Sequence, residues 1–175
     1  MPTLKKQVEI FDIEIVLDTY KQSYIKYNFD DENFYKVISE VCMDLFKELL
    51  NNYEWDFVQL QINYYDWENQ NAKAYYEALE ERNIPCIVME PVRGGSLQKL
   101  NDEAVEVFKK LSDNSPASYA LRFVAELPNV LVTLSGMSTY EQVEDNINTF
   151  NECKPLSDEE KKAIEKANVL FRKNF

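Results

Sequence analysis

Histidine is absent from this 175-residue sequence. Without it neither a Ser–His nor a Cys–His nucleophilic pair can form, so enzymes that depend on such a pair are excluded. Glycine is scarce, with 3 residues, and two of these are adjacent at positions 94 and 95. This glycine pair therefore stands out as a place where the backbone could approach a ligand closely.

Cysteine is equally rare. The 3 cysteines, Cys42, Cys86 and Cys153, are odd in number and widely spaced, and none belongs to a CxxC pair. Their pattern predicts free thiols in a reducing compartment, with neither a disulfide framework nor a metal or iron–sulfur site.

Long apolar runs are also missing. No stretch approaches the ~20 apolar residues that a transmembrane helix needs. The first six residues, from Met1 to Lys6, lack the apolar core of a signal peptide. We therefore expect a cytoplasmic protein with no membrane partner.

Basic residues are outnumbered, with 19 Lys and Arg against 31 Asp and Glu and a formal net charge of −12. This charge repels nucleic acid, and no basic cluster with interleaved aromatic residues offsets it. We expect no nucleic-acid partner. An anionic dinucleotide would also be repelled unless groups within its own site compensate.

The remaining composition is that of one globular domain. Hydrophobic residues make up 45% of the chain and the mean hydropathy is −0.45, which is ordinary for a soluble folded protein. A chain of this length buries one sizeable core. A complete eight-stranded (β/α) barrel needs about 250 residues and does not fit.

The N-terminal part of the chain is the hardest to interpret. Residues 1–42 form a divergent segment ahead of the main part, residues 43–175. The apolar residues between positions 8 and 17 fit a strand about as well as a helix, and their spacing does not decide between the two. Residues 30–52 favour a helix capped by Asp30 or Asp31, because apolar residues recur there at helical spacing.

Three strand-then-helix units follow, with predicted strands at residues 56–62, 86–90 and 130–135. Each strand is followed by polar residues at its carboxyl end, where a (β/α) barrel places its ligand site. This alternation is typical of parallel βαβ architecture. The predicted fold class is α/β, a partial (β/α) barrel of about three parallel strands with outer helices.

The helices that accompany these strands are predicted at residues 70–83, 102–111 and 116–127. A serine followed by proline at 115–116 is a strong start signal for the third of them. The last two helices are opened by Ser138 and Ser157, because residues 138–141 and 157–160 match the capping-box pattern.

Three motifs could bind a ligand, and each has a plain structural alternative. Arg93 with the glycine pair forms either a phosphate loop or a strand-to-helix turn that needs positive φ. The helix opened by Ser138, with Gln142 on the same face, either holds a phosphate at its amino terminus or is an ordinary capped helix. Gln61 needs a polar partner, which is either a ligand or another buried group.

Taken together, four ordered segments resemble the C-terminal half of the aldo/keto reductases. They are residues 56–67, 89–95, 115–123 and 134–146. The resemblance extends over about residues 43–171. It implies the C-terminal half of an aldo/keto reductase barrel and a nicotinamide dinucleotide, NADP or NAD, as cofactor. Because the net charge of −12 opposes an anionic ligand, we expect this cofactor to bind weakly if at all.

The resemblance also implies roles for individual residues. Gln61 corresponds to a strand glutamine that contacts the nicotinamide carboxamide, and Met89 falls near the place of a tyrosine that stacks on the nicotinamide. The remaining implied cofactor residues are Pro91, Val92, Arg93 and Gly94 over the pyrophosphate, Gly136, Met137, Ser138 and Gln142 around the adenosine ribose and its phosphate, and Asp145 and Asn146 at the adenine.

The family's catalytic Asp, Tyr, Lys and His come from its N-terminal half, and no catalytic residue can be assigned here. Residues 37–42 take the place of a Gly-x-Ser segment without carrying it. We therefore expect an oxidoreductase-related polypeptide that carries the dinucleotide-binding half and is inactive alone. The alternative is a non-catalytic nucleotide-binding or structural remnant acting through protein contacts. Open sheet edges predict a homo-oligomer or a partner chain supplying the missing half.

Overall fold

The computed structural model describes residues 31–151 and 154–172. The strand-or-helix alternative for the apolar residues between positions 8 and 17 lies outside the described residues, as does Cys153. The chain divides into two units, Met1–Leu49 and Leu50–Phe175.

In the first unit, the predicted helix is confirmed as α3, Asp31–Asn52, whose last residues belong to the second unit. It contains neither glycine nor proline, the two residues that most disfavour a helix interior. Cys42 is an exposed free thiol on this helix.

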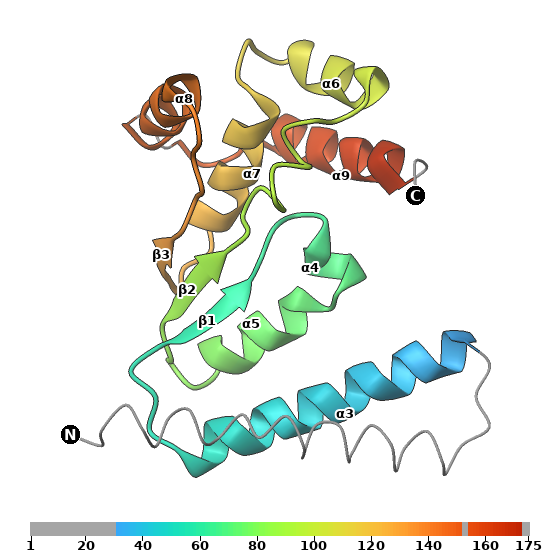
Figure 1. Cartoon of the computed structure of the whole chain (residues 1–175), viewed down its shortest axis with the longest axis vertical. Helices are drawn as coiled ribbons and strands as arrows, with labels where there is room; N and C mark the ends of the chain where they lie inside the picture. The colour runs from blue at the N-terminus through green and yellow to red at the C-terminus, as the bar shows by residue number, and fades with distance from the viewer. Residues whose placement is uncertain (1–30, 152–153, 173–175) are drawn as a thin grey trace. The chain divides into compact units, whose positions relative to one another are not determined.

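The second unit is built on a parallel sheet with strand order β1-β2-β3 (Figure 1). The strands are β1 at Val58–Gln61, β2 at Cys86–Met89 and β3 at Val130–Thr133. The three predicted strands and the α/β class are confirmed, and each strand is shorter than predicted. The strand β2 ends before Glu90 because that residue adopts a left-handed backbone conformation, with φ of 54°.

The two faces of this sheet differ in polarity. Gln61 lies beside Met89 in the register of β1 and β2, and successive residues of a strand point to opposite faces. Cys86 and Val88 are fully buried on one face, whereas Gln59 and Met89 are exposed on the other. The amide-bearing face is thus the more accessible one. Burial also raises the pKa of the Cys86 thiol to about 11, so this free cysteine is protonated at neutral pH.

Six helices accompany the sheet within the described residues. They are α4 at Asp66–Asn69, α5 at Ala72–Glu80, α6 at Asp102–Lys109, α7 at Pro116–Ala125, α8 at Tyr140–Asn151 and α9 at Asp158–Arg172. No helix in the described part of the chain is long and apolar enough to cross a membrane.

The helix predicted over residues 70–83 forms as α5, but it begins later and ends earlier than predicted. Asn71 takes a left-handed conformation with φ of 55°, which separates the short α4 from α5. Asparagine tolerates this conformation better than most residues. A four-residue helix is too short to show helical periodicity, so the sequence pattern missed α4.

Two of the predicted helix starts are confirmed. The Ser115 hydroxyl accepts a hydrogen bond from the Ser118 N–H at 3.0 Å, with Pro116 in the first turn. Ser157 and Glu160 form a reciprocal capping box, since each side chain accepts the backbone N–H of the other, at 3.2 and 2.8 Å.

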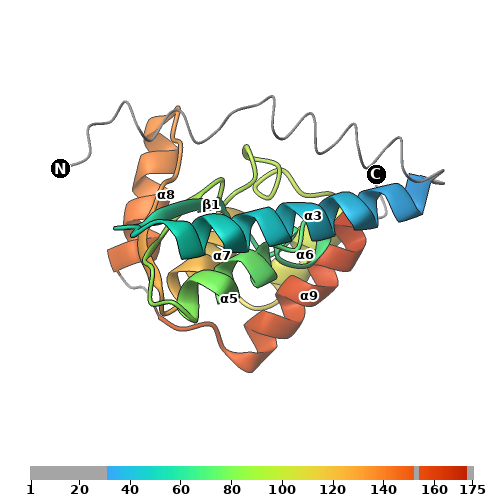
Figure 2. The same cartoon turned by 90° about the horizontal axis from the view of Figure 1, so that it is seen from below.

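The main core lies between the outer helices and the segment after β2. α6 and α9 pack side by side (Figures 1 and 2). Phe108 stacks on Tyr119, with ring centroids 4.3 Å apart. The buried residues of this core are Tyr64, Leu97, Leu100, Ala104, Phe108, Tyr119, Ala120, Leu156, Ala163, Ile164, Ala167 and Phe171.

Candidate functional site

The turn that follows β1 is organised by Asn63. Its side-chain Oδ1 accepts hydrogen bonds from the backbone N–H groups of Tyr65 and Asp66, at 3.1 and 2.8 Å. Its Nδ2 donates to the Glu90 carbonyl at 3.0 Å, which ties the end of β1 to the end of β2. Asparagine suits this place because its amide both accepts and donates.

Asp66 lies at the centre of this polar network. Its side chain is fully buried, and its Oδ2 accepts hydrogen bonds from Gln61 Nε2 and Asn63 Nδ2, both at 2.8 Å. Its Oδ1 accepts from Arg93 Nε at 3.2 Å. A buried carboxylate is costly unless it is paired and hydrogen-bonded, and this one is both. The Asp66 carboxylate thereby brings together two predicted site residues, Gln61 and Arg93.

The loop after β2 has an unusual backbone. Glu90, Arg93, Gly94 and Gly95 all have positive φ, at 54°, 51°, 60° and 83°. The nearest atom to a Cβ added at Gly94 would be Glu90 Oε2 at 3.6 Å, so backbone conformation and not space calls for glycine there. The Gly94 N–H donates to the Glu90 carboxylate. The prediction that this turn needs positive φ is therefore confirmed. Whether the loop also binds a phosphate stays a prediction.

Arg93 is held in this loop by two further features. Its guanidinium carbon lies 4.6 Å from the centroid of the Tyr65 ring, within cation–π distance. Its side chain is 29% exposed, although Nε is bound to the buried Asp66. The Asp66 carboxylate and the Tyr65 ring thus orient the guanidinium, while part of the Arg93 side chain faces solvent.

The segment after β3 is open to solvent. Gly136, Met137 and Ser138 are all exposed, and Met137 is 46% exposed. The prediction that Ser138 caps the next helix was wrong. Thr139 takes that place, because its hydroxyl accepts the Gln142 N–H at 3.4 Å while Gln142 Oε1 accepts the N–H groups of Ser138 and Thr139 at 2.7 and 3.3 Å. The same box motif is displaced by one residue, which Thr139 permits because serine and threonine cap alike.

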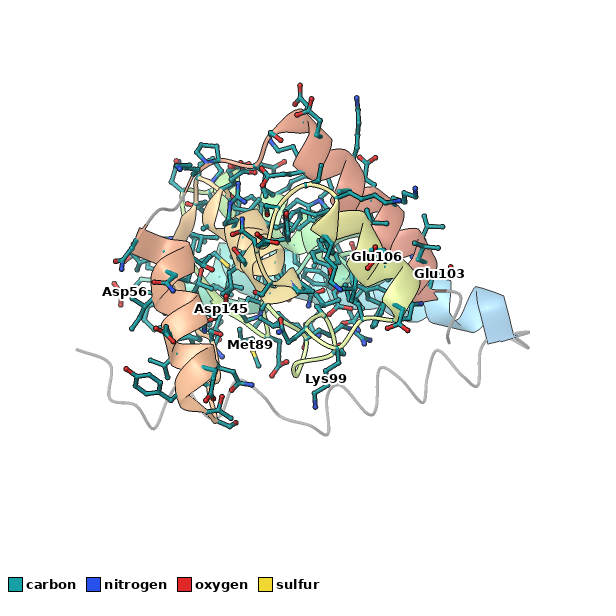
Figure 3. The ribbon with its side chains drawn as sticks, turned by 90° about the horizontal axis from the view of Figure 1, so that it is seen from above. Asp56, Met89, Lys99, Glu103, Glu106 and Asp145 are labelled. Atoms are coloured by element: carbon teal, nitrogen blue, oxygen red, sulfur yellow. The ribbon has the colours of Figure 1, made fainter. Side chains whose placement is uncertain are left out.

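Asp145 and Asn146 make structural contacts on α8. Ser115 Oγ donates to Asp145 Oδ2 at 2.6 Å, which links α8 to the start of α7. The buried Asn146 donates through Nδ2 to Ser135 Oγ at 3.0 Å, which fixes the segment after β3. Figure 3, viewed from above, labels Asp145 together with Met89 at the end of β2.

Of the predicted site residues, Gln61 and Arg93 are linked to one another, whereas Asn146 is held separately. Hydrogen bonds join Gln61 and Arg93 through Asp66 at the ends of β1 and β2, and they join Asn146 to the segment after β3. Within the described residues no cluster of three or more His, Cys, Asp or Glu side chains could hold a metal ion.

The sequence pattern did not identify Asn63 and Asp66 as site residues, although their side chains join the end of β1 to the segment after β2. The available signal was an Asn-x-x-Asp spacing directly after an apolar strand, which favours a side-chain-capped turn.

Comparison with known proteins identifies relatives of this chain. The model of the aldo/keto reductase family matches residues 35–169. Among solved structures, the chain is similar to an aldo-keto reductase from Bacillus halodurans in its holo form, with 20% identity and a TM-score of 0.55 over 71% of this chain. The apo form of that reductase matches with 16% identity and a TM-score of 0.54 over 87% of this chain. No curated protein gave a match.

The solved relatives are longer than this chain. The matched part spans 46% of the holo structure and 67% of the apo structure. At these identities the structural likeness establishes the fold alone. The family model, however, covers most of the 175 residues. The chain belongs to the aldo/keto reductase family.

Proposed function

We propose that this chain carries the nicotinamide-dinucleotide-binding half of an aldo/keto reductase, with its parallel sheet forming an arc of a (β/α) barrel. The observation that supports this most strongly is the Asp66 network, which gathers Gln61 and Arg93 at the carboxyl ends of β1 and β2. Ligand sites of such barrels lie at that edge. The cofactor proposed is NADP or NAD.

Each predicted residue has a place in this proposal. Gln61 meets the nicotinamide carboxamide, and Met89, 37% exposed, offers a polarisable thioether beside the ring where an aromatic residue would stack. Residues 91–94 lie over the pyrophosphate, with Arg93 as its cation. Residues 136–138 and Gln142 hold the adenosine ribose and its phosphate, and Asp145 and Asn146 lie at the adenine.

The proton donor for carbonyl reduction is proposed to come from outside these 175 residues. A tyrosine that protonates a carbonyl oxygen works best when its pKa is lowered toward neutrality. Burial instead raises the pKa of Tyr64 and is the main cause of the raised pKa of Tyr76. Neither tyrosine is tuned for this task, and histidine is absent from the chain.

A second candidate function is a nucleotide-binding or structural remnant without catalysis. The contacts of Gln142, Asp145 and Asn146 favour it, because their hydrogen bonds already serve α8 and its neighbours. Isothermal titration of the full chain with NADP(H) and NAD(H) separates a dinucleotide-binding chain from a purely structural remnant. Saturable binding supports the cofactor-binding half, and no binding at millimolar dinucleotide supports the structural remnant.

If dinucleotide binds, we expect Arg93→Ala to weaken binding about tenfold, near what one hydrogen bond to a charged group contributes. Ser138→Ala should weaken binding less than Arg93→Ala does, because it removes a neutral hydroxyl and not a cation. We also expect weak binding with little preference for NADP over NAD, since residues 135–142 contain no lysine or arginine.

Titration calorimetry of both variants measures this difference, and Arg93→Lys is the matched control that keeps the charge but loses the fork geometry. Thermal melting of each variant checks that Asp66 remains accommodated in the fold. Tight binding of NADP with strong rejection of NAD, or binding indifferent to Arg93→Ala, contradicts this prediction.

We further propose that the chain associates, either with itself or with a partner chain that supplies the remaining half. Within the described residues, β1 and β3 each pair only with β2. Exposed apolar side chains also gather on β3 and α8 and in the segment between them: Leu131, Val132, Leu134, Met137, Tyr140, Ile147 and Phe150. Unpaired strand edges and apolar patches of this kind promote pairing between chains.

The expected result is a mass above 20.6 kDa by size-exclusion chromatography with light scattering at micromolar concentration. Replacing Tyr140 and Ile147 by serine should lower that mass, because they are 78% and 53% exposed on α8. Val169→Ser is the control, since Val169 is similarly exposed, at 55%, on the separate helix α9. A monodisperse 20.6 kDa species with no partner recovered counts against association.

A further inference from the structure

The side-chain amide of Gln61 has a determined orientation. Its nearest polar partner is Asp66 Oδ2, at 2.8 Å. A carboxylate accepts hydrogen bonds and donates none, so only the nitrogen of the Gln61 amide can face it. The amide oxygen, Oε1, is consequently turned away from Asp66.

Asp66 itself is fixed from several directions. Besides Gln61, its carboxylate receives Asn63 Nδ2 and Arg93 Nε, and its backbone N–H donates to Asn63 Oδ1. It is fully buried. Three donors converge on one carboxylate, and Arg93 supplies the opposite charge, so each of these hydrogen bonds uses the Asp66 side chain as an acceptor.

We propose that Asp66 is the positioning residue that determines which nicotinamide-like ring the site prefers. By holding Gln61 Nε2, it presents Gln61 Oε1 as a hydrogen-bond acceptor. The site then prefers a ring whose substituent carries an N–H donor over one whose substituent only accepts. This inference rests on the proposed dinucleotide-binding function.

A pair of ligands that carry the same net charge tests the preference directly. NADP carries a carboxamide, and its 3-acetylpyridine analogue replaces the amide nitrogen with a methyl group of similar size. The net charge of the ligand is unchanged, so repulsion by the acidic protein affects both equally. The wild-type chain should bind NADP about tenfold more tightly than the analogue, because the analogue leaves Oε1 without a donor.

Asp66→Asn should reduce this preference and bring the ratio of the two dissociation constants closer to one. The new amide keeps the volume of Asp66 but carries a donor as well as an acceptor, so Gln61 is no longer confined to the orientation with Nε2 inward, and Nε2 can also turn outward. An outward donor serves the carbonyl oxygen that both ligands share. If Asp66 has only a structural role, the variant weakens both ligands by the same factor and the ratio is unchanged, which overturns the proposal.

Glu160→Gln is the matched control. Glu160 is also a carboxylate bound to a buried arginine, Arg122, but it joins α7 to α9 and touches neither Gln61 nor Asp66. This variant should lower the melting temperature while keeping the preference for NADP. Loss of the preference in Glu160→Gln would show that general loosening controls the ratio, which also overturns the proposal.

Nuclear magnetic resonance of the free protein provides a readout that needs no ligand and no variant. The Gln61 side-chain amide protons should exchange with solvent at least about tenfold more slowly than those of the exposed Gln70. Where Asp66→Asn folds, its Gln61 protons should lose this protection. Equal exchange of Gln61 and Gln70 in the wild type overturns the proposal even if the variant does not fold.

The same measurement separates two kinds of failure. If neither dinucleotide binds but Gln61 is protected, the proposed dinucleotide function fails, and the ligand preference built upon it is overturned. If both bind equally well while Gln61 is protected, the proposed function stands and the specificity role of Asp66 is overturned.

Discussion

The isolated chain is expected to reduce no carbonyl compound measurably with NADPH. Carbonyl reduction needs a proton donor aligned with the hydride, and general acid catalysis alone contributes about 10²–10⁴-fold. The proposed function places the catalytic residues outside this chain, which contains no histidine. The pKa values of Tyr64 and Tyr76 are raised, which opposes proton donation.

The measurement is NADPH oxidation followed by absorbance, with a standard aldehyde and pure protein. A complete aldo/keto reductase assayed alongside sets the scale of ordinary turnover. Turnover of the aldehyde by this chain at ordinary rates for the family would show that the proposed division between cofactor binding and catalysis is wrong. Activity that appears only after addition of a second polypeptide would support it.

Removing the Arg122 side chain is expected to destabilise the fold by about 3–5 kcal/mol, the usual cost of breaking a buried ion pair by taking away one partner. Arg122 is 9% exposed and donates to both oxygens of Glu160, at 2.7 and 2.9 Å. It also donates to the carbonyls of Lys154 and Pro155, at 2.9 and 3.1 Å. Arg122→Met preserves much of the apolar bulk while removing every one of these donors.

Urea denaturation measures the free energy of unfolding of this variant. Lys73→Met is the control, because Lys73 and Glu77 form an exposed pair, 50% and 52% exposed, whose loss costs at most about 1 kcal/mol. A destabilisation by Arg122→Met no greater than that of the control would show that Arg122 does not bind the ends of α7 and α9 together.

The difference between Arg122→Met and the wild type should also depend on pH. Hydrogen bonding from Arg122 is the main cause that holds the pKa of Glu160 below its usual value. A depressed folded-state pKa contributes stability above the unfolded pKa of about 4.3, and this contribution is lost as the pH falls through the lower folded value. The gap between the two proteins should therefore narrow in acid.

Local chemistry made much of the fold predictable. The Ser115–Pro116 start and the capping box of Ser157 and Glu160 depend on residues a few positions apart, so the sequence shows both partners at once. The three parallel strands were predictable for a related reason, since short apolar runs alternated with helices. Boundaries were less predictable. Glu90 and Asn71 end or divide elements through left-handed backbone conformations that non-glycine residues adopt only occasionally.

The amino-acid sequence by itself determined the family, the three strands and the longer helices, and which residues are candidates for cofactor contact. Only the tertiary structure decided how those candidates are partnered. Asp66 and Arg93 are 27 positions apart along the chain, and parallel pairing of β1 with β2 brings them to 3.2 Å. The polarity of the Gln61 amide follows from that contact, because a hydrogen bond has a direction that composition and spacing do not encode.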